Sequence, residues 1–133
     1  RRDASSILVV EQARDLIKLE ATGMYGGVYH VLAGRLDPLG GVEPGDLAID
    51  SLRARVTDPA RNARSVAVEE VILGLNPDLE GDSTALYLAD VLAESGVAIS
   101  RLARGLPSGS QIEYASAQVL SDAIEGRQGV EQG

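Results

Sequence analysis

The chain has 133 residues, a hydrophobic fraction of 44% and a formal net charge of −8 at pH 7. This length fits a single domain, and this composition can supply a buried core. The absence of cysteine excludes disulfides and cysteine-bound zinc within the chain, and the acidic excess without Trp or Phe disfavours tight nucleic-acid binding by the chain alone.

The N-terminus carries neither an initiator Met nor a secretory signal. We therefore expect the chain to begin inside a longer protein, and the lack of disulfides fits a cytoplasmic one. No apolar run approaches the roughly 20 residues that a membrane-spanning helix needs, so we expect no membrane contact.

Apolar runs alternate with helical patterns in the first part of the chain. The β-branched run at 7–10 predicts a strand covered on both faces. A helix is predicted next, ending near Gly23, from apolar residues at helical spacing: Ala13, Leu16, Ile17 and Ala21. A second strand is predicted at 27–32, and a long Gly/Pro-rich loop follows at 33–46.

The middle of the chain continues this alternation. A helix is predicted at 44–56 with Pro44 near its start, followed by a polar connector at 57–67 that we expect to be mobile. A third strand is predicted at 69–76. The clearest helix is predicted at 82–96, ending at Gly96, with one apolar stripe: Ala85, Leu88, Ala89 and Leu92.

The last part predicts a fourth strand at 97–103, a turn at 104–110, a helix at 116–126 and a frayed tail at 127–133. The inward-facing residues of that helix are predicted to be Ala117, Leu120 and Ile124. Strands alternating with helices predict an α/β domain with a mostly parallel sheet and helices on both of its faces.

Acidic side chains gather where two of the predicted strands end. Asp78, Glu80 and Asp82 lie within five residues, just after the third strand and its terminal Asn76, and Glu11 directly follows the first strand. The carboxyl ends of parallel strands meet at one edge of a sheet. If the first and third strands are neighbours, these side chains share one solvent-facing site.

Several explanations of this cluster remain open. Crowded carboxylates repel one another, and magnesium, a basic partner or an internal Arg would offset the repulsion. Magnesium binds through one or two carboxylates, so Glu11, Asp78 and Glu80 are its candidate ligands. The structural alternative is that Asp82 or Ser83 is the N-cap of the following helix, whose dipole favours acidic residues near its start.

Four separated motifs give a more specific indication: ILVVE, GVYHVLAGRLDPLGG, EEVILGLNPDLEGDSTALYLADVL and SRLARGLPSGSQIEYA. In this order they resemble the RecR family of bacterial recombination mediators, over nearly the whole chain. The resemblance implies a Toprim fold, a small mostly parallel sheet sandwiched between helices. It divides the chain into a linker at 1–6, a Toprim domain at 7–109, a C-terminal helix segment at 110–126 and a flexible tail at 127–133.

The resemblance also implies a function. It is that of a non-catalytic module in recombinational DNA repair, acting with RecO and RecF to promote RecA loading on gapped single-stranded DNA. It implies a ring-like homo-oligomer when full length, with DNA bound only through that oligomer. The family's helix-hairpin-helix and zinc motif lie upstream of the Toprim domain and are absent here, so zinc is expected only in that upstream part.

The acidic positions can be compared with those of catalytic Toprim relatives, which carry a Glu after the first strand and a DPDREGE-like motif after a later one. Glu11, Asp78 and Glu80 match acidic positions, and Asp82 stands where Glu is common. Asn76 replaces the leading Asp and loses a charge, so the resemblance implies only weak magnesium binding. No other cofactor is expected in this part of the protein.

Site residues follow from this comparison. Glu11, Glu80 and Asp82 are predicted to form a docking face for RecO, and Arg104 is assigned to partner or ring contacts. His30 is either a hydrogen-bonded core residue or a functional one. The alternative functions are a magnesium-dependent Toprim nuclease or phosphotransferase, which a single His and no Cys disfavour, and a purely structural domain whose acidic loop only caps a helix.

Overall fold

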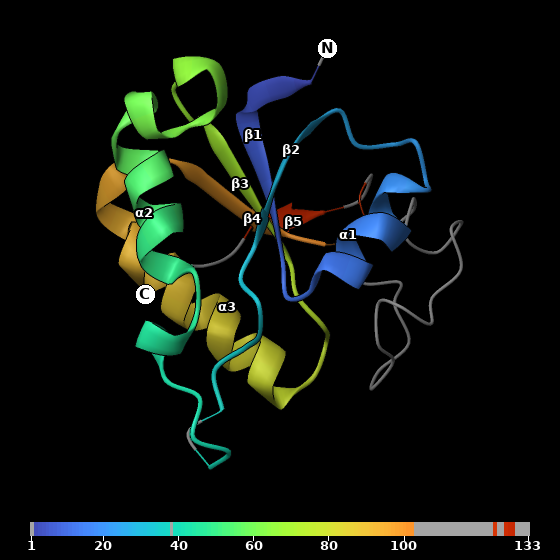
Figure 1. The fold of residues 1–133 in the computed structure, drawn as a ribbon, viewed down its shortest axis with the longest axis vertical. Helices are drawn as coiled ribbons and strands as arrows, with labels where there is room; N and C mark the ends of the chain where they lie inside the picture. The colour runs from blue at the N-terminus through green and yellow to red at the C-terminus, as the bar shows by residue number, and fades with distance from the viewer. Residues whose placement is uncertain (1, 38, 103–123, 125–126, 130–133) are drawn as a thin grey trace.

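The computed structural model describes residues 2–37, 39–102, 124 and 127–129 (Figure 1). Five strands form one sheet in the order β2-β1-β3-β4-β5. Their bounds are β1 Asp3–Val10, β2 Gly27–Val31, β3 Glu70–Gly74, β4 Ala98–Arg101 and β5 Gln128–Gly129. The first four are parallel, and β5 runs antiparallel to β4. The predicted α/β fold with a mostly parallel sheet is therefore confirmed.

Helices cover both faces of this sheet (Figure 1). The α-helices are α1 Ala13–Glu20, α2 Ile49–Thr57 and α3 Leu79–Leu92. Short 3-10 helices are η1 Pro44–Asp46, η2 Pro59–Arg61, η3 Ala63–Ser65 and η4 Ala93–Ser95. Within the described part of the chain, no helix has the length and apolar character needed to cross a membrane.

Strand β1 forms the centre of the core. Residues 7–10 have no exposed surface, as expected for a strand covered on both faces. Ile7 and Val9 belong to the core cluster that includes residues of α2 and α3, and Leu8 and Val10 belong to the cluster that includes Leu19 of α1. Fully burying each such side chain contributes about 1.5–3 kcal/mol. The strand that carries Glu11 is therefore held firmly from both sides.

The predicted apolar stripe of α3 is confirmed, since Ala85, Leu88, Ala89 and Leu92 are all buried. Helix α1 is confirmed, but of the four apolar residues that predicted it, only Leu16 packs against the core. Ile17 is 68% exposed, and the buried residues of this helix are Asp15 and Leu19. Asp15 accepts a hydrogen bond from the backbone N of Gln12 in a capping box, and this arrangement turns the Asp15 face of α1 inward.

The N-terminal segment assigned to a linker contributes to the sheet, because β1 begins at Asp3. Ala4 is only 1% exposed, and the Oγ of Ser6 lies 3.0 Å from the phenol oxygen of Tyr25. The two serines of this segment hid the apolar alternation that would predict a strand.

Three further boundaries differ from the prediction. Helix α2 begins at Ile49, because the backbone N of Ala48 donates to the carbonyl of Leu32 and interrupts the helical path after η1. The connector at 57–67 is built from η2 and η3, and Asn62 between them is buried. The tail prediction is wrong for 127–129, because β5 pairs with the edge of β4.

Ile124 is buried, which confirms its predicted inward orientation. The turn predicted at 104–110, including Arg104, lies outside the described residues. So do Ala117 and Leu120 of the predicted last helix.

Candidate functional site

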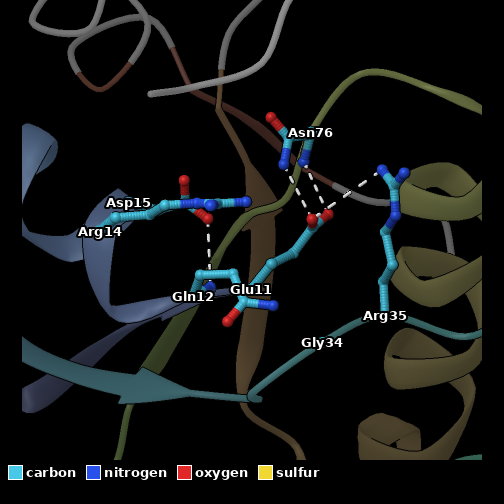
Figure 2. Close-up of a pocket in the computed structure, with 7 residues that line it drawn as sticks. All are labelled: Glu11, Gln12, Arg14, Asp15, Gly34, Arg35 and Asn76. Carbon is cyan, nitrogen blue, oxygen red and sulfur yellow. Dashed lines mark hydrogen bonds and ion pairs between the residues drawn. The ribbon is translucent and has the colours of Figure 1, made fainter. Parts of the chain in front are cut away.

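The condition for a common site is met, because β1 and β3 are neighbours with Val10 opposite Gly74. Glu11 and Asn76 therefore emerge side by side (Figure 2). The backbone N of Asn76 donates to Oε2 of Glu11 at 3.0 Å, and its Nδ2 donates to Oε1 at 2.8 Å. Both residues are almost completely buried. The Asn that replaces an acidic residue of catalytic relatives is thus the hydrogen-bond donor that holds Glu11.

Arg35 supplies a positive charge next to Glu11 and Asp78. It follows β2, and the backbone N of the preceding Gly34 donates to the carbonyl of Glu11 at 2.9 Å. Its Nη1 lies 3.9 Å from Oε1 of Glu11 and also donates to Oδ2 of Asp78. Burial by itself lowers the pKa of Arg35, but the hydrogen bond to Asp78 and the neighbouring carboxylates raise it overall.

Burial raises the pKa of Glu11. The two hydrogen bonds from Asn76 and the charge of Arg35 act in the opposite direction, and the charge of Asp78 adds to the effect of burial. Desolvation penalises the charged form of a carboxyl, and donors directed at its oxygens compensate only partly. The charged form of Glu11 is therefore penalised by burial and depends on Asn76 and Arg35 for stabilisation.

Asp78 is the N-cap of α3, and its Oδ1 accepts a hydrogen bond from the backbone N of Gly81 at 2.8 Å. The prediction that Asp82 or Ser83 caps this helix is wrong, because the helix already begins at Leu79. Glu80 thus lies in the first turn, where the helix dipole favours negative charge.

Asp82 also lies in the first turn of α3, facing solvent. Its Oδ1 accepts a hydrogen bond from Arg101 at 2.6 Å, and both side chains are exposed. The structure therefore divides the predicted cluster into two parts. Glu11 and Asp78 contact Arg35, whereas Asp82 contacts Arg101 outside this centre.

A small polar pocket opens beside Glu11, between β1, α1 and the loop after β2 (Figure 2). Its volume is about 120 Å³, well below the roughly 300–1,000 Å³ of pockets for organic ligands. The lining residues are Glu11, Gln12, Arg14, Asp15, Gly34, Arg35 and Asn76. It has room for a few water molecules and none for a nucleotide.

The oxygens of Glu11 and Asp78, two of the predicted magnesium ligands, already have partners in the structure. Both oxygens of Glu11 accept hydrogen bonds from Asn76, and those of Asp78 face Gly81 and Arg35. Across the residues that the structure describes, no group of three or more His, Cys, Asp or Glu side chains is arranged to hold a metal ion. Sequence reasoning allowed an internal Arg as counter-charge but did not identify Arg35.

His30 is a hydrogen-bonded core residue. Its Nε2 donates to the carbonyl of Ala48 at 2.7 Å, and its Nδ1 accepts from Arg55 at 3.1 Å. Arg55 also donates to Oδ1 of Asn62, whose Nδ2 donates to the carbonyl of Ala4 at 2.7 Å. Burial lowers the pKa of His30, and the charge of Arg55 lowers it further against the effect of the Ala48 bond. This network ties α2 and the connector to β1 and β2.

Comparison with known proteins agrees with this architecture. The model of the Toprim domain family matches residues 5–103, so the chain belongs to the Toprim domain family. The chain is also 49% identical over 128 residues to "Recombination protein RecR" of Rhodopirellula baltica, covering 96% of this chain and 61% of that protein.

Two further proteins of the same name are similar over nearly the whole chain. The protein of Cutibacterium acnes is 48% identical over 127 residues, and that of Chlorobium phaeobacteroides is 45% identical over 126 residues. Within the Toprim family, this is a RecR-like protein. The chain spans about three fifths of the length of these relatives.

Proposed function

We propose that this chain is the non-catalytic Toprim module of a recombination mediator in DNA repair. Its role is to dock RecO, and in the full-length homo-oligomer it acts with RecO and RecF to promote RecA loading on gapped single-stranded DNA. The similarity to proteins named RecR supports the mediator role. Two carboxylates in the first turn of α3, the exposed Asp82 and the half-buried Glu80, support the docking role.

The proposed docking face consists of four residues of α3: Leu79, Glu80, Asp82 and Leu86. The helix contains no Lys or Arg between Leu79 and Leu92. Leu79 and Leu86 are 77% and 63% exposed on the same helix as Glu80 and Asp82. Exposed leucines bordered by carboxylates suit a basic partner that also brings apolar side chains, as a basic patch on RecO would.

Glu11 was predicted for the same face but is buried against Asn76, so we assign it to holding the loop and the helix start. Glu80 and Asp82 remain as the docking carboxylates. The ion pair between Asp82 and Arg101 is exposed, and such a pair contributes only about 0–1 kcal/mol, so a partner can displace it at little cost.

Charge reversal tests this proposal. Glu80→Lys and Asp82→Lys are each expected to weaken RecO binding about tenfold at low salt, chiefly through a slower association rate, because rim charges steer the encounter. Surface plasmon resonance at two salt concentrations measures both effects. Glu69→Lys is the matched control, since Glu69 is exposed next to the opposite end of β3. Equal affinities for all three variants would count against docking at α3.

The proposed absence of catalysis rests on the same geometry. Glu11 and Asp78 are engaged by Asn76 and Arg35, and the pocket beside them is too small for a nucleotide. Hydrolysis of DNA by the purified chain with magnesium or manganese, lost on Glu11→Gln, would overturn this part of the proposal.

A further inference from the structure

One nitrogen of Arg35 interacts with two carboxylates from different parts of the chain. Nη1 donates to Oδ2 of Asp78. The same atom lies 3.9 Å from Oε1 of Glu11 (Figure 2). A cation between the acid that follows β1 and the acid that caps α3 offsets the charge of both. Here a side chain of the protein itself provides this positive charge.

The loop on both sides of Arg35 is fixed. On one side the backbone N of Gly34 donates to the carbonyl of Glu11, and on the other the backbone N of Leu36 donates to Oγ1 of Thr84 at 3.0 Å. Thr84 is completely buried in α3 and donates in turn to the carbonyl of Glu80. Because its neighbours are held to β1 and to α3, the backbone of Arg35 is fixed beside the two carboxylates.

The backbone before Arg35 adopts conformations that favour glycine. Ala33 has a φ of +67° and Gly34 a φ of +145°. A non-glycine residue in the left-handed region costs roughly 1–2 kcal/mol. The turn that directs Arg35 between the two carboxylates is thus kept despite a local cost.

We propose that Arg35 is the built-in cation of this acidic site and excludes a divalent metal ion from it. The positive guanidinium repels a second cation, and it occupies the carboxylate oxygen of Asp78 that a metal would need. Magnesium keeps several waters and needs only one or two carboxylates, so Arg35 decides whether the site accepts it.

Removing the charge of Arg35 should open the site to a divalent ion. In Arg35→Gln, the Glu11 and Asp78 carboxylates lose their shared counter-charge, although Asn76 still holds Glu11. We expect a divalent ion to bind between the two acids in place of the guanidinium. The variant is expected to be less stable than the original chain without divalent ions and to regain stability when they are added.

The experiment uses the full chain, Arg35→Gln and the control Arg53→Gln. Arg53 is an exposed residue of α2 and does not line the pocket. Thermal unfolding is followed by circular dichroism with magnesium or with sodium chloride at equal ionic strength, which separates specific binding from screening of the acidic surface. Manganese binding is measured directly by electron paramagnetic resonance of the free ion.

We expect Arg35→Gln to bind manganese about tenfold more tightly than the original chain, which corresponds to ~1.4 kcal/mol. Its melting temperature should rise with magnesium more than that of Arg53→Gln. If Arg35→Gln is unfolded without divalent ions, recovery of its circular dichroism on adding manganese supports the proposal, and failure to recover overturns it. Equal manganese affinity in the original chain and Arg35→Gln overturns it as well.

Discussion

Asn76→Asp restores the acid that catalytic Toprim relatives carry, and we expect it to destabilise this domain strongly at neutral pH. In the native chain, Nδ2 of Asn76 donates to Oε1 of Glu11 at 2.8 Å. The substitution replaces this donor with a carboxylate oxygen next to a buried carboxylate. Two like charges about 3 Å apart interact by roughly 6 kcal/mol at an effective dielectric constant of about 20.

Proton uptake limits this cost. Protonating one carboxyl of ordinary pKa near 4 at pH 7 costs about 4 kcal/mol, because each unit corresponds to about 1.4 kcal/mol. The pair shares a proton, since this route costs less than full repulsion. The free energy of unfolding should therefore fall by about 4 kcal/mol at pH 7, and the loss should shrink by about 1.4 kcal/mol for each unit of lower pH until it levels off near pH 4.

Urea unfolding of Asn76→Asp from about pH 5 to pH 7.5 measures this slope. Asn76→Ala is the matched control, because it removes the side-chain donor without adding charge. It should cost about 1.5–3 kcal/mol, as for other lost hydrogen bonds to charged groups, with little dependence on pH. An equal and pH-independent loss in the two variants would refute the reasoning.

A second substitution checks the cause. In the double variant Glu11→Gln with Asn76→Asp, the new amide can accept from the backbone N at position 76 and donate to the new carboxylate. Hydrogen bonds are thereby kept with the roles exchanged, so the double variant should be more stable at pH 7 than Asn76→Asp alone. Additive losses would show that charge repulsion is not the cause.

Two further substitutions test other contacts. Gly81→Ala should destabilise the domain by about 2 kcal/mol, because a Cβ at this position would lie 1.9 Å from the carbonyl oxygen of Asn76; Gly26→Ala, with nothing within 4 Å, is the control for urea unfolding. His30→Gln should reduce the acid sensitivity of the domain. Because the pKa of His30 is lowered from 6.5, the native chain loses stability as the pH falls below about 6.5, at up to about 1.4 kcal/mol per unit.

Each of these two predictions has an outcome that would contradict it. Alanine in an unstrained helix normally stabilises relative to glycine by about 1 kcal/mol, so a more stable Gly81→Ala would show that α3 shifts freely away from Asn76. His30 is the only histidine in the chain. An unchanged slope of stability against pH in His30→Gln would assign the acid sensitivity to carboxyl groups whose pKa is lowered in the folded chain, such as Asp3.

The sequence by itself determined the fold class and the approximate position of most strands and helices. The apolar run at 7–10 and the stripe of α3 were both confirmed, because burial on two faces or on one helical face leaves a periodic pattern. The place of Glu11 and Asn76 after strands was also readable. The sequence did not predict the start of β1 at Asp3–Ser6 or strand β5. These segments contain polar residues, because strand ends and sheet edges are not buried on both faces and so lack a periodic apolar pattern.

Only the tertiary structure decided how the charges are balanced. Strand order placed Glu11 beside Asn76, and the path of the loop after β2 brought Arg35 to Asp78 across 43 residues of sequence. The same applies to the cap of α3, which Asp78 provides through its bond to Gly81. Composition counts charges, but the free energy of each charge depends on distance and burial, and these exist only once the chain has folded.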